Sequence, residues 1–128
     1  MSAGATMRAM VLERANAPFV PRELPTPEPA AGEVAIDVAA CALNFADLLL
    51  IEGRYQDMPP APFTPGLEFS GRVTALGPGV AGPAPGTRVA LYAGHGGLAT
   101  RANVPAGLCL PVPDTLCDAT AAAFQVTY

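Results

Sequence analysis

The side chains best suited to metal binding or nucleophilic chemistry are few and widely spaced. His95 is the single histidine in 128 residues, and glycines flank it on both sides. Cys41, Cys109 and Cys117 are odd in number and irregularly spaced, which is typical neither of a disulfide framework nor of a zinc knuckle. We predict free, mostly buried thiols and a histidine in a solvated loop. A Cys-His-Asp protease site is not indicated, because no pattern supplies an oxyanion hole or an orienting group.

A glycine string matches the dinucleotide-binding fingerprint in its letters alone. Gly77, Gly79 and Gly82 have the G-x-G-x-x-G spacing. That fingerprint requires a helix that starts inside the string and holds the pyrophosphate on its N–H groups, with an acidic residue about 20 positions later. Pro78 and Pro83 exclude the helix, and no carboxylate follows at that distance. The string therefore predicts a β-turn.

Asn44 and Asp47 have the spacing of a helix capping box, in which two side chains satisfy free N–H groups at a helix start. The apolar run 48–51 follows and Gly53 closes the segment, which predicts a helix of two or three turns. On the residues alone, Asn44 is either a helix cap or a group that faces a binding site. We interpret Asp47 as part of the capping box rather than as a catalytic acid.

Composition limits the classes of partner. The formal net charge is -4, and the seven basic residues are single, scattered arginines that form no stripe for nucleic acid. The apolar runs are far shorter than the ~20 residues of a bilayer-spanning helix. Residues 1–6 lack the basic and apolar regions of a secretory signal. We therefore expect a cytoplasmic protein with no nucleic-acid partner and no membrane span.

Short strands must position these residues. Fifteen prolines and thirteen glycines interrupt a chain that is 51% hydrophobic, a pattern typical of short strands joined by turns. We predict strands at residues 8–12, 34–40, 69–75, 88–92 and 98–104, an extended, proline-broken stretch that cannot be helix at 18–29, and a proline-rich loop at 58–65. Asp118 is predicted to cap a second helix that begins at residue 119. The fold class is mainly β, a small, partly open β-barrel with short helices.

Several motifs together resemble the medium-chain dehydrogenase/reductases in order and spacing. They are Gly32-Glu33-Val34, Cys41-Ala-Leu-Asn44-Phe-Ala-Asp47, Gly53-Arg-Tyr55, Pro65-Gly66-Leu-Glu68-Phe-Ser-Gly71, Gly77-Pro-Gly79-Val80, Gly86-Thr-Arg88-Val89 and Gly96-Gly97-Leu-Ala99. The resemblance covers residues 7–128 and is to the N-terminal, GroES-like catalytic domain. Its details are similar to the zinc-free quinone oxidoreductase branch that includes zeta-crystallin.

The resemblance implies a domain organisation. Residues 1–6 would be a disordered N-terminal extension, and residues 7–118 the GroES-like catalytic domain. Residues 119–128 would start the helix that leads to a cofactor-binding Rossmann domain. We expect that second domain in the full protein, and it is absent from this chain.

The resemblance also bears on zinc. In zinc alcohol dehydrogenases of this superfamily, a cysteine, a histidine and a third ligand hold the catalytic metal, at positions that correspond here to Asn44, Leu67 and Phe124. Leucine and phenylalanine offer no lone pair, Cys41 is three residues out of register, and the cysteine-rich lobe for structural zinc is missing. We expect no metal site. Glu68 resembles the glutamate beside that metal, and we interpret it here as structural.

The implied site residues lie in three segments. The resemblance places Asn44 and Tyr55 as catalytic residues in the cleft where nicotinamide and substrate meet. An amide can bond the nicotinamide carboxamide or a quinone oxygen, and a phenol can stack or donate a hydrogen bond. The alternative for Tyr55 is a packed loop aromatic. The implied cofactor-binding residues are Asn44, Gln125, Thr127 and Tyr128.

The function implied is NADPH-dependent, zinc-independent hydride transfer to quinones or similar conjugated carbonyls, by a homodimer of the full-length protein. Without a Lewis acid, an acceptor that is already electrophilic is favoured. Because the missing domain would bind most of the NADPH, we expect this chain alone to be inactive and to bind NADPH weakly or not at all. Three alternatives stay open: a stand-alone GroES-like protein-interaction module, an enoyl reductase, and a vesicle-associated relative whose role is not chiefly catalytic.

Overall fold

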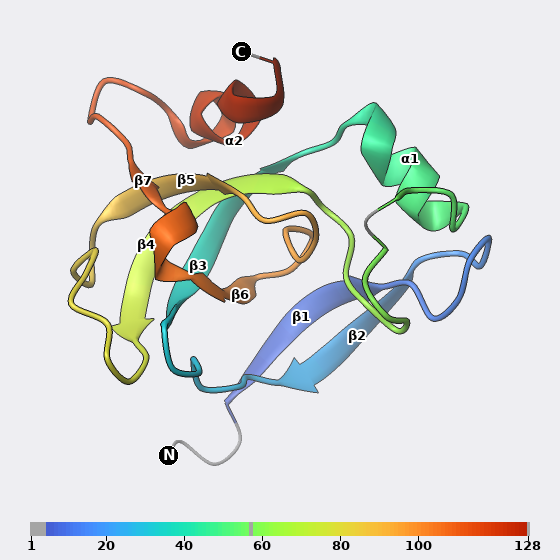
Figure 1. Ribbon diagram of the computed structural model, residues 1–128, viewed down its shortest axis with the longest axis horizontal. Helices are drawn as coiled ribbons and strands as arrows, with labels where there is room; N and C mark the ends of the chain where they lie inside the picture. The colour runs from blue at the N-terminus through green and yellow to red at the C-terminus, as the bar shows by residue number, and fades with distance from the viewer. Residues whose placement is uncertain (1–4, 57, 128) are drawn as a thin grey trace.

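Two antiparallel sheets organise the described residues, 5–56 and 58–127, of the computed structural model (Figure 1). The smaller sheet pairs β1 (Thr6–Val11) with β2 (Val20–Pro25). The larger sheet has the order β6-β3-β4-β5-β7. Its strands are β3 (Glu33–Ala42), β4 (Glu68–Leu76), β5 (Arg88–Tyr92), β6 (Arg101–Pro105) and β7 (Leu110–Pro111). The helices are α1 (Phe45–Ile51), α2 (Asp118–Thr127) and the short 3-10 turn η1 (Ala106–Leu108).

This mainly β architecture with short helices confirms the predicted fold class. Val34, Ala35 and Ile36 of β3 are all completely buried and Asp37 is exposed, so the start of the strand is covered on both faces and departs there from the predicted period-two pattern. The inward-facing side chains of the larger sheet form its main core. They are Val34, Ile36, Phe69, Val73, Val89, Leu91, Val104 and Cys109.

A second core cluster fixes α1 and the proline-rich loop that follows it. Leu12, Leu50, Phe63 and Leu67 pack together there, and the side chain of Tyr55 packs against them. Backbone bonds between Leu12 and Phe63, in both directions at 2.8 and 3.1 Å, tie the loop to the end of the smaller sheet. Because a fully buried leucine contributes roughly 1.5–3 kcal/mol, this cluster holds the loop firmly against α1.

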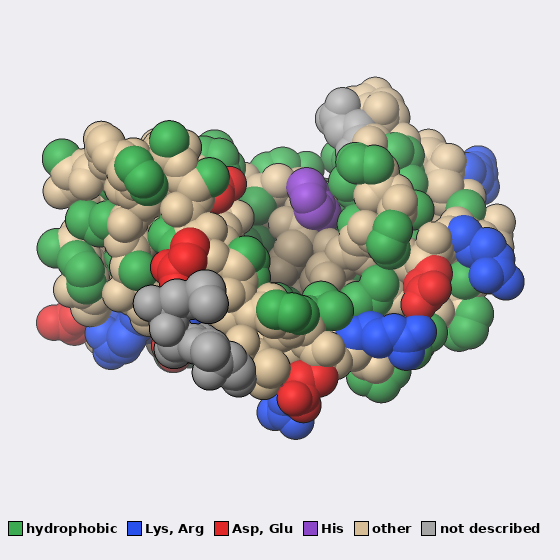
Figure 2. Space-filling view, turned by 90° about the horizontal axis from the view of Figure 1, so that it is seen from below, with side chains coloured by type: hydrophobic (Ala, Val, Ile, Leu, Met, Phe, Trp, Pro, Cys, Tyr) green, Lys and Arg blue, Asp and Glu red, His purple; other side chains and the backbone are tan. Residues whose placement is uncertain are grey.

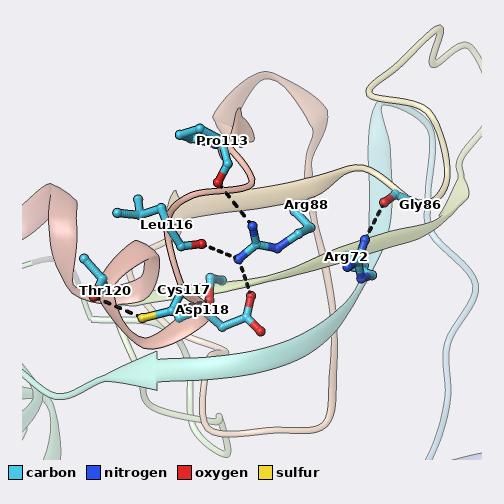
Figure 3. Close-up of polar contacts among 9 residues, drawn as sticks. Arg72, Gly86, Arg88, Pro113, Leu116, Cys117, Asp118 and Thr120 are labelled. Carbon is cyan, nitrogen blue, oxygen red and sulfur yellow. Dashed lines mark hydrogen bonds and ion pairs between the residues drawn. The ribbon is translucent and has the colours of Figure 1, made fainter.

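Arg88 and Ser70 anchor α2 to the larger sheet. The Arg88 guanidinium donates to the carbonyls of Pro113 and Leu116 at 3.2 and 2.7 Å, and pairs with the Asp118 carboxylate at 2.9 Å (Figure 3). The Ser70 hydroxyl donates to the Asp118 carbonyl at 2.7 Å. Two neighbouring strands therefore fix the start of the helix.

The structure corrects several predicted boundaries. Asp118 lies within α2 and bonds Arg88, so it is not a cap before the helix, and the expected boundary at 118/119 falls inside its first turn. Thr6 belongs to β1 rather than to an N-terminal extension, and residues 1–4 lie outside the described residues. The strand expected at 98–104 spans Arg101–Pro105, because the chain before it bonds β1 instead.

The glycine string 77–82 is the predicted turn. The Val80 N–H donates to the Gly77 carbonyl at 3.2 Å, and Gly79 has a φ of 79°, a conformation that glycine adopts without strain. The prolines therefore exclude the helix that a dinucleotide-binding motif requires, although the glycine spacing matches that motif. Separately, none of the helices in the described residues is long and apolar enough to cross a membrane.

Gly71 is required by the close approach of β3 and β4. It pairs with Val38 beside an irregularity in the β3–β4 register. A Cβ at this position would overlap the carbonyl oxygen of Asp37 and lie 2.8 Å from Ile36 Cγ2. The backbone of β3 would have to move to admit even a methyl group.

We predict that Gly71→Ala lowers the free energy of unfolding by about 3 kcal/mol, because overpacking forces β3 and β4 apart. Urea denaturation monitored by circular dichroism measures this loss. Gly107→Ala is the control, because a Cβ there has no atom within 4 Å, and it should change stability by less than about 0.5 kcal/mol. Equal effects of the two substitutions would contradict the packing argument.

Candidate functional site

Asn44 occupies the N-cap of α1, with extended backbone angles. Asp47 Oδ2 accepts the Asn44 N–H at 2.8 Å, which is the predicted capping-box contact. The Asn44 side chain lies on the Asp47 N–H side of this box but makes no capping hydrogen bond, since that N–H donates to the Asn44 carbonyl at 3.0 Å. Its Nδ2 donates instead to Glu68 Oε1 at 3.1 Å. Asn44 is therefore the N-cap residue of the predicted capping box, with its amide nitrogen directed to Glu68, and a role for it in a binding site stays a prediction.

Glu68 joins the two helices through one carboxylate. It is the first residue of β4 and is only 1% exposed. Oε1 accepts from Asn44, and Oε2 accepts the Val126 N–H of α2 at 3.0 Å. A buried carboxylate is stable only when its oxygens are hydrogen-bonded, and these bonds meet that need. Glu68 thus holds the start of α1 and the last turn of α2 in one arrangement.

The bond to Glu68 sets the orientation of the Asn44 amide. An ionised carboxylate only accepts hydrogen bonds, so the nitrogen of the amide must face it. The amide oxygen, Oδ1, lies in the capping box toward the Asp47 N–H, and because it has two lone pairs it keeps capacity to accept a further hydrogen bond. This oxygen can therefore serve a partner outside the described chain.

Two tyrosine hydroxyls meet near the same strand end. The oxygens of Tyr55 and Tyr92 lie 3.2 Å apart. Tyr92 is the last residue of β5 and stands opposite Glu68 in the β4–β5 register. The ring of Tyr55 packs against the second core cluster, so it is a packed aromatic that also carries a polar hydroxyl. Sequence reasoning missed Tyr92, because only the strand register places it here.

Asp47 holds the chain before β4 against α1. Its side chain is buried, and Oδ1 accepts the Gly66 N–H at 3.0 Å. Burial raises the pKa of Asp47, and the N–H groups of Asn44, Gly66 and Leu67 act in the opposite direction. The group therefore positions the site without facing it, as the capping-box interpretation requires.

Large apolar side chains are exposed on both helices and on the residue before α1. Phe45 is 74% exposed and Leu43 is 70% exposed. Leu48 of α1 and Phe124 and Val126 of α2 are also exposed. These exposed side chains lie on or beside the two helices that Glu68 links. Such surfaces are typical of binding sites for apolar groups or other domains.

The structure does not bring Gln125 to Asn44. Gln125 lines an apolar groove of about 300 Å³ between α2 and the segment that contains β7, and its Nε2 is buried without a hydrogen-bond partner in the described chain. Thr127 is the last residue of α2, and Tyr128 lies outside the described residues. A cofactor role for these residues stays a prediction.

The residues at the positions of the zinc ligands do not fit a metal. Leu67 is 1% exposed and packs in the second core cluster, and the Asn44 amide nitrogen is bonded to Glu68. Within residues 5–56 and 58–127, histidine, cysteine and acidic side chains form no group of three that could hold an ion. Isolated donors cannot build the tetrahedral N/S site that zinc requires.

The three cysteines differ in solvent exposure, whereas the sequence predicts mostly buried thiols. Cys41 is half-buried, and burial together with Asp47 and Glu68 raises its pKa to about 12. Cys109 is buried, and burial raises its pKa. Cys117 is exposed, which corrects the expectation of burial, and hydrogen bonds from Thr120 lower its pKa. His95 is exposed as expected, with its ring edge-on to Phe63 at 6.3 Å between centroids.

The fold and this site define the class of protein: an N-terminal GroES-like domain with a polar site between two helices. Residues 30–114 match the alcohol dehydrogenase GroES-like domain family. The chain therefore belongs to this family, within the medium-chain dehydrogenase/reductase superfamily.

Named relatives include quinone oxidoreductase-like and VAT-1 proteins. The chain is 36% identical over 126 residues to quinone oxidoreductase-like protein 2 of Bos taurus, covering 98% of this chain and 36% of that protein. It is 39% identical over 102 residues to the synaptic vesicle membrane protein VAT-1 homolog of Rattus norvegicus, covering 80% and 25% respectively. The chain therefore spans about a quarter to a third of the length of these relatives.

Solved structures of both kinds share the fold. The quinone oxidoreductase from Thermus thermophilus, also solved in complex with NADPH, has a TM-score of 0.82 and 40% identity, over 94% of this chain and 37% of that one. The human VAT-1 homolog-like protein has a TM-score of 0.86 and 36% identity, over 94% and 40%.

We predict that Asp47→Asn destabilises the chain by about 2 kcal/mol at neutral pH, because one buried N–H loses its acceptor. A carboxyl whose pKa is raised on folding binds its proton more tightly in the folded state. The Asp47 carboxyl therefore stabilises the fold most at a pH below its pKa in the unfolded chain. This contribution is lost as the pH rises through its pKa in the folded chain. The difference from wild type should therefore widen on acidification from about pH 7 to about pH 4. Denaturation at both pH values, with the exposed Asp114→Asn as control, tests this.

Thiol alkylation should follow exposure and pKa. With iodoacetamide under native conditions, Cys117 should be labelled first, because the thiolate is the reactive form and its side chain is accessible. Cys41 and Cys109 should react only after denaturation in urea. Mass spectrometry of proteolytic peptides reports each site, and Cys117→Ser should remove the rapid reaction. Rapid native labelling of Cys41 would contradict the described burial.

Proposed function

We propose that this chain is the substrate-side domain of an NADPH-dependent, zinc-independent oxidoreductase that transfers hydride to quinones or similar conjugated carbonyls. The observation that carries the proposal is the Asn44 amide, which Glu68 orients with its oxygen able to accept, beside the Tyr55–Tyr92 hydroxyl pair. The proposal includes a homodimeric, cytoplasmic full-length protein.

The polar groups suit a nicotinamide and an oxygen-bearing acceptor. When bound, NADPH supplies the hydride. Asn44 Oδ1 would accept a hydrogen bond from the nicotinamide carboxamide and orient the ring. When the Tyr92 hydroxyl donates to Tyr55, the Tyr55 hydroxyl keeps its own hydrogen, which it would donate to the acceptor's oxygen. Both groups act by positioning, which contributes to the rate by fixing the reacting geometry.

The apolar surface supports the placement of a second domain. Phe45 and Leu48 of α1 and Phe124 of α2 are exposed apolar side chains on the two helices that Glu68 links. A domain that follows α2 and covers this surface would exclude water from the site and clamp the nicotinamide. The Thermus thermophilus relative was solved with NADPH, and this chain matches 37% of it.

A second candidate function is a binding role without turnover. The VAT-1 relatives are as similar to this chain as the quinone oxidoreductase-like ones. An enoyl reductase is a third candidate, because the described site does not distinguish a quinone oxygen from an enoyl thioester oxygen. A substrate assay separates all three.

The test is NADPH oxidation by the protein encoded by the complete reading frame that contains this chain. We expect turnover with 1,4-benzoquinone and slower turnover with crotonyl thioester. Asn44→Ala and Tyr55→Phe should each lower kcat/KM by about tenfold, the effect of losing about one hydrogen bond in the transition state. Glu23→Gln on exposed β2 is the control and should leave the rate unchanged.

The outcomes separate the candidates. Preference for crotonyl thioester assigns the enoyl reductase. Absence of turnover with both acceptors, for a protein that binds NADPH, overturns the reductase and favours the binding role. Because the 128-residue chain alone should bind NADPH weakly or not at all, micromolar binding by that chain in a calorimetric titration would contradict a cofactor site shared with another domain.

A further inference from the structure

A cavity of about 310 Å³ opens on the side of the molecule away from the two helices. It lies between β6 and the smaller sheet, and Figure 2, the view from below, shows the hollow beside the single histidine. None of its lining residues belongs to the Asn44 site. The polar lining side chains are Glu33, Thr64, His95, Arg101 and Asn103, and the apolar ones include Met7 and Pro27.

Two buried side-chain atoms without hydrogen-bond partners in the described chain, Arg101 Nε and Asn103 Oδ1, belong to residues that line this cavity. Arg101 is the single cation of its lining. The Arg101 Nε is buried 3.7 Å from Asp37 Oδ1, beyond hydrogen-bond distance, and its terminal nitrogens bond no described residue. His95 is exposed at the cavity, and desolvation by the surrounding chain lowers the pKa of its imidazole.

The open edge of β6 adds main-chain donors. β6 is the outer strand of the larger sheet, next to β3. Val38 N–H bonds the Thr100 carbonyl, and Ala106 N–H bonds the Gly32 carbonyl, so the even-numbered positions face β3. Backbone groups alternate along a strand. The N–H and C=O groups of Arg101 and Asn103, two residues of the cavity lining, therefore point away from β3.

The hydrogen-bond acceptors near Arg101 are already hydrogen-bonded, exposed to solvent or not bonded to the guanidinium. Glu33 Oε1 accepts the Ala30 N–H at 2.9 Å. Asp37 is 63% exposed, so solvent screens its interaction with Arg101. The Asn103 Nδ2 donates to the Pro27 carbonyl at 3.1 Å, which closes one end of the cavity, and the buried Asn103 Oδ1 bonds none of the cavity's donors. None of these acceptors forms a hydrogen bond with the Arg101 guanidinium within the described residues.

We propose that this cavity is a second binding site, for a small molecule whose carboxylate is held by Arg101 and the outward N–H groups of β6 and whose apolar body lies against Met7 and Pro27. A guanidinium matches a carboxylate with two parallel hydrogen bonds, and backbone N–H groups supply further donors. The carboxylate belongs either to a free organic acid or to the C-terminus of a short peptide. The site is independent of the proposed reductase function.

The test is titration of the 128-residue chain with benzoate, followed by amide NMR and calorimetry. Benzoate should shift the amide signals of Arg101 and Asn103, and benzamide, which has the same shape without the charge, should bind at least about tenfold more weakly. Arg101→Gln should weaken benzoate binding by at least about tenfold. Arg22→Gln, at an exposed arginine outside the cavity, should have no effect.

Further ligands identify the source of the carboxylate, and further variants are compared only when their fold is intact. Tighter binding of tri-alanine than of benzoate assigns a peptide terminus, and the reverse assigns a free acid. Glu33→Gln should strengthen benzoate binding, because it removes a negative charge from the lining. The proposal is overturned if benzamide binds as tightly as benzoate, or if amidated tri-alanine binds as tightly as tri-alanine. It is also overturned if an Arg101→Gln variant that melts like the wild type binds benzoate with unchanged affinity. Loss of binding in Glu33→Gln, with the fold intact, would also overturn it.

Discussion

One buried carboxylate determines the arrangement of the candidate site. Glu68 lies at the start of β4 and accepts hydrogen bonds from the Asn44 side chain and from the backbone of α2. An ionised group in so enclosed a position is tolerated only while both oxygens keep their donors. The chain therefore cannot shift either helix without exposing or orphaning that charge. The same requirement fixes which end of the Asn44 amide faces outward.

Local spacing predicts the parts of the site that depend on neighbouring residues. Asn44 and Asp47 are three residues apart, and the capping contact between them needs only a helix start. The turn at Gly77 follows from the prolines around it. In such cases the conformation is decided by interactions within one turn of chain, so the local sequence is sufficient to predict it.

Contacts between distant segments are not predictable in the same way. The Tyr55–Tyr92 pair joins residues 37 positions apart and depends on the β4–β5 register. Asp118 departs from its expected capping role because Arg88, 30 positions earlier, offers its carboxylate a stronger partner than a helix N–H does. Gln125 lines the groove beside β7, a position set by the rotation of α2 on the sheet. Register and helix rotation are set by packing, which single-residue patterns do not contain.

The burial of Leu67 opposes the introduction of a metal at this site. This side chain fills part of the apolar cluster formed with Leu12, Leu50 and Phe63. An imidazole at that position would place a polar ring among hydrocarbon neighbours, at a cost of roughly 1–3 kcal/mol before any ion arrived. A cysteine at position 44 would also leave Glu68 without one of its donors. A histidine at position 67 or a cysteine at position 44 would each destabilise the fold if introduced alone. A zinc site here would need both substitutions together with repacking of the apolar cluster.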